Sequence, residues 1–532
     1  MSVAVQSVPS TRERLRDDVR ALLEDDHRLL AVVAENLAGS DIGTNSDGSS
    51  NSSDNSMVRM GYLFARPAPL GERRVELVLE IPTADPWVPT IADLSYPGGR
   101  FEREIRDLFG VVPRDHPLPR RLVRHAHWPR AWHPLLGDRD AAVPPPDFTE
   151  DVSSFPFLEV AGDGVYEIPV GPVHAGMIEP GHFRFSVVGE TIVRMKARLW
   201  YVHRGVERLF EGQPPTSGIA LAERISGDTA VGHALAYAMA CEEALGLDVA
   251  PRHLLARALL LELERMHNHA ADLGMILNDV AFGLANVHLQ AVREQLLRLN
   301  DSVTGHRLLR GGVRLGGARM VALPQPDAVN EAAARIAEVV ELALDHPMIT
   351  DRLTGAAVLH RADAVRMGTL GYVARASGVD LDARRDHGFL VEDATSPASA
   401  GGALQFAERP ALEESGDVLA RFLVRAREVQ ESARLVVQLT GRLVSPDLPE
   451  PGEASGRAAA GTRRGLGIVE AWRGLLCHRV SIGADGRLHR VKVVDPSFMN
   501  WPALPVALAD TIVPDFPLAN KSFNQSYAGN DL

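Results

Sequence analysis

The chain has 532 residues, 45% of them hydrophobic, which is enough for two to four domains with a large core. Its formal net charge of −13 argues against nucleic acid as a partner, because nucleic-acid binding depends on basic surface. No apolar run reaches the ~18 residues of a membrane span, the N-terminus lacks a signal-peptide pattern, and two cysteines give no disulfide framework. We therefore expect a protein of the reducing cytoplasm.

The first hundred residues predict helix followed by strands. Residues 11–37 carry apolar side chains at helical spacing, which indicates one or two amphipathic helices. The polar, low-complexity residues 38–56 bury too little apolar surface to fold, so a flexible loop is expected there. Residues 58–65 and 74–81 predict strands, the second with clear alternation.

A motif follows in residues 101–138. Residues 104–109 predict an amphipathic helix that ends at Gly110, but a helix alone does not explain the Asp-His-Pro of residues 115–117 and the Arg-Leu of residues 121–122 at fixed distance. Together these residues resemble the 30-kilodalton subunit of respiratory complex I and its hydrogenase counterparts. The resemblance implies a small adaptor domain, residues 1–128, that docks against neighbouring subunits without chemistry of its own.

The remainder predicts a second, larger unit. Residues 129–157 are rich in Pro and Asp and indicate a linker, so the second domain is expected to span 158–532. The overall class expected is α+β, with a small N-terminal α/β domain and then a mainly helical domain with antiparallel sheets at its start and near its C-terminus. The predicted strands are 164–170, 183–188, 191–199 and three within 465–494, and the long predicted helices are 252–277 and 411–439.

Several motifs of this second unit agree in order and spacing. They are GPVH at 171–174, HRGVE at 203–207, ERISGDTAVGH at 223–233, ELERMHNHAADLG at 262–274 and NWPAL at 500–504. They resemble the large subunit shared by complex I, where it is the 49-kilodalton protein, and membrane-bound hydrogenases. The fused domain order and NWPAL look most like the large subunits of hydrogenase-4 and formate hydrogenlyase.

In that family two segments, Arg-x-Cys-x-x-Cys-x-x-x-His and Asp-Pro-Cys-x-x-Cys, supply four thiolates to a nickel–iron centre. In this chain the four ligand positions, here called the cage positions, fall on Ser226, Thr229, Ser526 and Gly529. Arg224 and His233 are kept, whereas Cys241 and Cys477 stand elsewhere. Such metals select soft thiolate ligands and a hydroxyl is a hard donor, so the replacement implies that the chain is not an active nickel–iron hydrogenase.

Four other residues are candidates for a remaining site. Glu179 matches a family glutamate that passes protons to the metal site, and its alternative role is a loop carboxylate that binds backbone amides. His233 is either functional or a satisfied helix histidine. Arg224 is an ion-pair candidate, and Asp228 is a new carboxylate beside the cage positions for which the family suggests no role.

Quinone is the acceptor that complex I relatives bind in this cleft, with a Tyr and a His. Here the Tyr position falls on Gly227, and the His falls near Pro180, flanked by His174 and His182. A quinone-like cleft is therefore expected without a clean match to the quinone ligands. The His pair of residues 267–269 points to two sides of a helix, which argues against a shared metal ion, and no glycine-rich fingerprint predicts NAD or ATP binding by this chain itself.

The resemblance implies a subunit of a membrane-associated oxidoreductase complex related to hydrogenase-4 and NADH-quinone oxidoreductase. Its expected work is electron transfer to a quinone-like or other acceptor, coupled to ion movement, and the alternative is a non-catalytic scaffold. The expected partners are a small subunit that carries an iron–sulfur cluster and antiporter-like and other membrane subunits, which would hold the chain on the inner face of the cell membrane.

Overall fold

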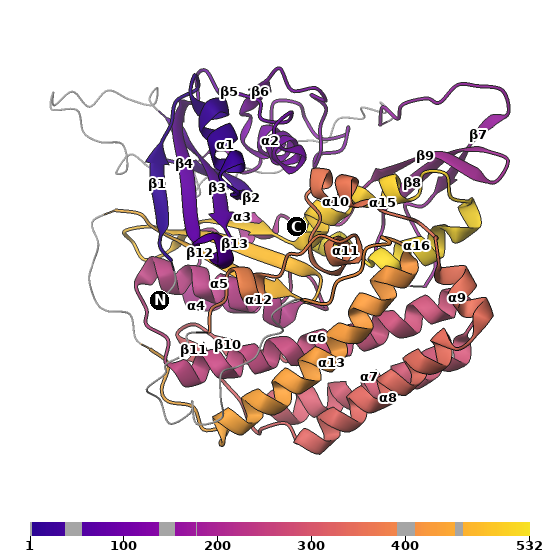
Figure 1. The fold of residues 1–532 in the computed structure, drawn as a ribbon. Helices are drawn as coiled ribbons and strands as arrows, with labels where there is room; N and C mark the ends of the chain where they lie inside the picture. Colours follow the sequence, from indigo (N-terminus) through magenta and orange to yellow (C-terminus); the bar gives the residue numbers. More distant parts are fainter. Residues whose placement is uncertain (1–2, 38–55, 138–154, 177, 391–409, 453–460) are drawn as a thin grey trace.

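The computed structural model describes residues 3–37, 56–137, 155–176, 178–390, 410–452 and 461–532. These residues form several small sheets and a large group of helices (Figure 1), so the predicted α+β class is confirmed. The predicted flexible loop, except Ser56, and residues 138–154 of the predicted linker lie outside the described residues. None of the described helices combines the length and apolarity that crossing a membrane takes.

The N-terminal part is a four-stranded sheet in the order β1-β4-β3-β2, in which β1 pairs parallel and the other pairs are antiparallel. Helix α2 starts after Ser95, whose hydroxyl accepts a bond from the Gly98 amide, and it ends as predicted at Gly110, which has a φ of 77°. The bounds are β1 Val5–Pro9, α1 Leu15–Glu24, β2 Arg28–Asn36, β3 Met57–Arg66, η1 Ala68–Leu70, β4 Arg73–Pro82, β5 Trp87–Pro89, α2 Tyr96–Phe109 and β6 Val112–Arg114.

One prediction for this part was wrong. Residues 11–37 are not all helical, because only α1 is a helix and residues 28–36 form β2. The seven central residues of β2 are buried, and the strand packs against both α2 and the C-terminal sheet. A strand covered on both faces carries a continuous apolar run instead of alternation, and such a run does not distinguish strand from buried helix.

The second sheet consists of β7 Val165–Val170, β8 His182–Val188 and β9 Thr191–Arg198, all antiparallel, with the predicted turn at Gly189 and Glu190. Among the helices that follow, α6, α7, α8 and α13 pack against one another as a bundle on the lower side of the molecule (Figure 1). Their bounds, with those of one short hairpin, are α3 Val206–Phe210, α4 Pro215–Ala222, α5 Ala230–Leu245, α6 Pro251–Asp279, α7 Gly283–Thr304, β10 Val313–Arg314, β11 Gly317–Ala318, α8 Pro326–Leu344, α9 Pro347–Leu353, α10 Arg361–Met367, α11 Gly371–Ala376, α12 Ala383–Asp386 and α13 Val418–Leu443.

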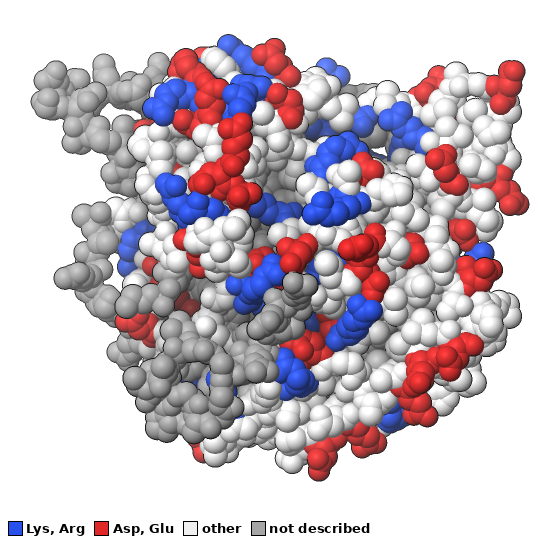
Figure 2. Space-filling view, viewed as in Figure 1, with Lys and Arg blue, Asp and Glu red and all other residues white. Residues whose placement is uncertain are grey.

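Helix α13 begins later than the predicted residue 411. The Asp417 side chain accepts a bond from the Ala420 amide at 2.8 Å and so fixes the helix start at Val418. On the outside of the bundle, α8 exposes Glu331, Glu338 and Glu341, and acidic side chains line the lower edge of the face drawn in Figure 2.

The C-terminal sheet is an antiparallel meander of β12 Arg463–Ala471, β13 Gly474–Ile482 and β14 Leu488–Val494, which confirms the three predicted strands. The chain then passes through α14 Pro496–Asn500, α15 Ala503–Ala507, η3 Val513–Asp515, α16 Phe516–Phe523 and α17 Tyr527–Asp531. It ends in the middle of the molecule (Figure 1), where the Leu532 carbonyl accepts a bond from the Arg204 amide at 2.8 Å.

Buried ion pairs join the N-terminal part, through its sheet and through α2, to the C-terminal sheet. Glu76 of β4 accepts bonds from Arg479 of β13 at 2.9 and 3.1 Å, and also from Arg59. Glu104 of α2 accepts a bond from Lys492 of β14 at 2.7 Å. Because a buried charge without its partner is costly, these pairs fix how the two parts sit against each other.

Candidate functional site

The cage positions come together although they lie about three hundred residues apart in the sequence. The segment before α5 brings Ser226 and Thr229, and the segment before α17 brings Ser526. The Oγ atoms of Ser226 and Ser526 are 2.8 Å apart and form a hydrogen bond. A cavity of about 320 Å³, here called the cleft, opens beside them and is also lined by Asp228 and Arg473.

The hydroxyls at the cage positions are occupied with one another and with Asp228. Ser226 and Thr229 each donate to Oδ1 of Asp228 at 3.0 Å. Ser526 accepts a bond from the Gly529 amide at 2.9 Å, as the N-cap of α17. The positions that carry thiolates in the family therefore hold a closed network of hydrogen bonds.

Gly529 could not carry a side chain without a rearrangement. A Cβ atom built there would lie 2.6 Å from both Cγ and Oδ2 of Asp495, and below 3.0 Å something must shift. Asp495 is buried and held in place by two bonds, from His233 at 3.0 Å and from the Ser497 amide at 2.7 Å. The space of the fourth ligand is filled by this carboxylate.

An arginine neutralises Asp228. Arg473, at the turn between β12 and β13, donates through Nη1 and Nη2 to the two carboxylate oxygens at 2.7 Å each. Burial alone would raise the pKa of Asp228, but the Arg473 charge and the hydroxyl donors lower it to about 2. Arg473 is itself fixed by the carbonyl of Asn524 at 2.7 Å.

The donors at the cage positions do not fit a nickel–iron centre. Two serines and a threonine offer hard hydroxyl oxygens, and the glycine offers no donor. The two thiols are buried elsewhere, Cys241 on α5 and Cys477 on β13. Burial raises the pKa of each to about 12, which disfavours the thiolate that metals bind.

His233 lies behind the cage positions in a buried line of hydrogen bonds. Its Nε2 is 3.0 Å from Oδ2 of Asp495, and its Nδ1 is 3.1 Å from Nε2 of His478. Burial and then the neighbouring His233 lower the pKa of His478 far below its usual range, so that imidazole is neutral. With His478 donating through Nε2 to Nδ1 of His233, Nε2 of His233 is the nitrogen that donates to Asp495 beside Gly529.

Glu179 lines the cleft, but its geometry matches the alternative role that the sequence left open. Its Oε2 accepts a bond from the Ala528 amide at 3.0 Å, at the start of α17. His174 and His182 do not line the cleft. They contact carbonyls of their own loop, those of Gly181 at 2.7 Å and Gly171 at 3.1 Å.

Arg224 does not join the other candidates. Its side chain is 56% exposed, lies outside the cleft lining and donates to the carbonyl of Ala220. Gly227 does line the cleft, and a Cβ atom there would meet nothing within 4 Å. The position of the quinone-binding Tyr is thus open space.

Three residues of the site were not found from the sequence: Arg473, His478 and Asp495. They lie on or beside the C-terminal sheet, and no spacing connects them to residues 223–233. Their only signal was a polar residue in or next to an apolar strand, which is common in proteins. The histidines of 267–269 separate as predicted, because His267 contacts the Leu263 carbonyl and His269 contacts Glu428.

Two family models match the chain. That of the 30 Kd subunit of respiratory-chain NADH dehydrogenase matches residues 9–143, and that of the 49 Kd subunit matches residues 282–462. Hydrogenase-4 component G of Escherichia coli (strain K12) is 32% identical over 459 residues, which cover 85% of this chain and 76% of that protein. Formate hydrogenlyase subunit 5 of the same organism is 31% identical over 459 residues, 85% of this chain and 77% of that protein.

A further relative and a solved structure also resemble the chain. The C/D subunit of NADH-quinone oxidoreductase from Phocaeicola vulgatus is 30% identical over 377 residues, 66% of this chain and 70% of that protein. A chain of the membrane-bound sulfane sulfur reductase, an archaeal respiratory membrane complex, has a similar fold, with a TM-score of 0.61 and 24% identity. That likeness covers 69% of this chain and 99% of the other.

Proposed function

We propose that this chain, which belongs to the family of hydrogenase-4 component G and formate hydrogenlyase subunit 5, is the large subunit of a membrane-bound oxidoreductase complex and works without a nickel–iron centre. The membership confirms the family predicted from the motifs. The observation that carries the proposal is the network at the cage positions, where the Ser226 and Ser526 hydroxyls bond at 2.8 Å and Asp495 fills the space beside Gly529.

Without that centre, the cleft would pass electrons to an acceptor other than protons. Electrons would arrive from an iron–sulfur cluster in a small partner subunit and pass to an organic molecule bound beside Asp228 and Arg473. The cleft also offers Glu179 and Lys521 to a polar group of that molecule. A quinone-like acceptor fits the family. It would bind without the usual Tyr and His, since Gly227 has no side chain and His174 and His182 lie outside the cleft lining.

The rest of the complex follows from the family. Residues 1–128 would act as the adaptor and residues 158–532 as the large subunit, joined by the linker 129–157. An antiporter-like membrane subunit and its neighbours would hold the chain on the inner face of the cell membrane and couple electron transfer to ion movement.

A second candidate function is a non-catalytic scaffold. The bond from the Ala528 amide to Glu179 favours it, because this carboxylate already has a structural partner. In that case the network at the cage positions only stabilises the contact between the C-terminus and the segment before α5.

The two functions are separated by Glu179→Gln in the assembled complex. Glutamine keeps an oxygen acceptor for the Ala528 amide but cannot hold a transferable proton, so assembly is expected to remain intact. Losing a positioned acid–base group typically costs ~10²–10⁴ in rate, and we expect redox or ion-translocation activity to fall at least about tenfold. Glu190→Gln, on the exposed β8–β9 turn, is the matched control.

Nearly full activity in an assembled Glu179→Gln complex would end the proton-transfer role and favour the scaffold. Failure to assemble would identify Glu179 as a structural residue at the start of α17.

A further inference from the structure

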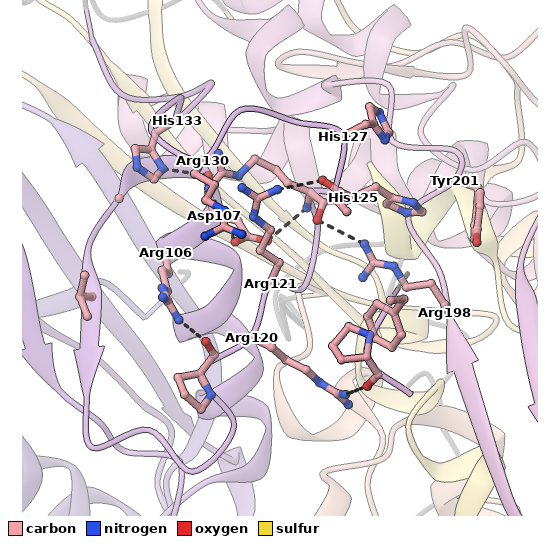
Figure 3. Close-up of a pocket in the computed structure, with 17 residues that line it drawn as sticks. Arg106, Asp107, Arg120, Arg121, His125, His127, Arg130, His133, Arg198 and Tyr201 are labelled. Atoms are coloured by element: carbon pink, nitrogen blue, oxygen red, sulfur yellow. Dashed lines mark hydrogen bonds and ion pairs between the residues drawn. The ribbon is translucent and has the colours of Figure 1, made fainter. Parts of the chain in front are cut away.

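A second cavity, of about 820 Å³, shares no lining residue with the cleft. It lies between α2, residues 119–133 and the end of β9, and cationic side chains face it from both parts of the chain (Figure 3). Figure 2 shows Lys and Arg side chains gathered between the N-terminal sheet and the β7–β9 sheet. We call this cavity the arginine pocket, and its arginines are Arg106, Arg120, Arg121, Arg124, Arg130 and Arg198.

The described part of the chain brings few carboxylates to this charge. Among the described residues that line the pocket, Asp107 is the only acidic one. One of its oxygens already accepts bonds from the Leu122 and Val123 amides at 2.8 Å each, and the other lies 4.0 Å from Nη2 of Arg124. The whole chain has a net charge of −13, so the charge of this pocket is opposite in sign to that of the protein.

Backbone carbonyls hold three of these arginines in place. Arg120 donates to the carbonyl of Pro156 at 3.0 Å, and Arg198 donates to the carbonyl of Leu122 at 2.5 Å. Arg124 donates to the carbonyl of Pro129 at 3.0 Å. Carbonyl oxygens orient a guanidinium without cancelling its charge.

Part of the donor capacity is unused. Arg124 is 5% exposed, and its Nε has no hydrogen-bond partner among the described atoms, as is also the case for Nε of Arg120. Burial lowers the pKa of Arg198 to about 10. Burial also lowers the pKa of Arg124, and the nearby positive charges of Arg121 and Arg106 lower it further. Like charges fixed close together and partly dehydrated repel each other, and a bound anion would relieve that repulsion.

One wall of the pocket is aromatic and less polar. The ring centroids of His125 and Tyr201 are 4.6 Å apart, edge to face, and burial followed by the charge of Arg198 lowers the pKa of His125 to about 4. His125 is therefore neutral near pH 7, and Phe155 also lines the pocket. Such a wall suits an organic group attached to an anion.

We propose that the arginine pocket binds a phosphate or pyrophosphate group carried by a small organic molecule. The planar fork of arginine matches phosphate oxygens in a bidentate way, which a single point charge does not. A volume of this order accommodates a ligand larger than one phosphate ion. The molecule is either a soluble phosphorylated metabolite or a phospholipid headgroup, since both present the same oxyanion.

The test is calorimetric titration of the purified full chain with inorganic pyrophosphate, at constant ionic strength set with potassium chloride. Saturable binding at one site is expected. The double variant Arg106→Gln/Arg120→Gln is expected to weaken it at least about tenfold, the loss expected for one charge-assisted bond. Arg298→Gln on α7, whose side chain is 77% exposed, is the control and should bind like the wild type.

The source of the oxyanion is decided by sedimentation with phosphatidylcholine vesicles that contain or lack phosphatidic acid. Binding only to the phosphatidic acid vesicles, lost in the double variant, assigns a lipid headgroup, whereas pyrophosphate binding without vesicle binding assigns a soluble ligand. Circular dichroism and the unfolding midpoint confirm that the variants are folded, and Arg120→Gln alone replaces the double variant if that one is not. The proposal is overturned if neither pyrophosphate nor the vesicles bind, or if the folded variant binds as tightly as the wild type.

Discussion

Replacing Gly529 by alanine is expected to destabilise the protein, although alanine is ordinarily the better residue in a helix. In α17 the new Cβ atom would lie 2.6 Å from Cγ of Asp495, whereas ordinary contact begins at 3.4 Å, so the carboxylate must move by about 0.8 Å. It cannot do so freely, because His233 and the Ser497 amide hold it in a fully packed interior.

The magnitude follows from these contacts. Overpacking of a core costs ~1–3 kcal/mol, and weakening a hydrogen bond to a buried charge costs up to ~3 kcal/mol. Alanine returns up to ~1 kcal/mol in helix propensity. We therefore expect Gly529→Ala to lower the free energy of unfolding by about 2–3 kcal/mol.

The assay is urea unfolding followed by tryptophan fluorescence, with Trp501 as a reporter beside the site. Its indole donates to the Ser526 carbonyl at 3.2 Å and its ring lies 4.8 Å from that of Tyr527. Gly227→Ala is the control, because a Cβ atom there meets nothing within 4 Å, and it should change stability by no more than ~0.5 kcal/mol. Equal stability of the two variants would refute the argument and mean that the space of the fourth ligand is available to a cysteine.

Two further outcomes are expected. Elemental analysis of the purified complex should find no stoichiometric nickel on this chain, because the cage positions lack thiolates, and about one nickel per chain would contradict the proposed function. Acid should weaken the contact between the two sheets, because burial raises the pKa of Glu76 but Arg479 and Arg59 together lower it to about 2. A folded-state pKa below the unfolded value of 4.5 contributes stability that is complete above about pH 5 and is lost as the pH falls towards 2, at most about 3 kcal/mol. The slope of unfolding free energy against pH in this window should be smaller in Glu76→Gln, and an unchanged slope would contradict the assignment.

Much of the fold could be predicted from the sequence because its signals are local. Alternation along β4, the Gly189 and Glu190 turn, and the glycine at the end of α2 depend only on neighbouring residues. Strand β2 could not be predicted, since its continuous apolar run reflects burial on two faces by segments distant in the sequence.

The sequence by itself determined the family and the residue types at the cage positions, two serines, a threonine and a glycine, since motifs and residue chemistry are written along the chain. Only the tertiary structure decided what fills the space around these positions. It paired Asp228 with Arg473, seated Asp495 in the space beside Gly529 and left Arg224 at the surface. The physical reason is that a charge or a side-chain volume acts over a few ångströms of space. The C-terminal sheet, which brings Arg473 and Asp495 to the site, lies more than two hundred residues after Asp228 in the sequence.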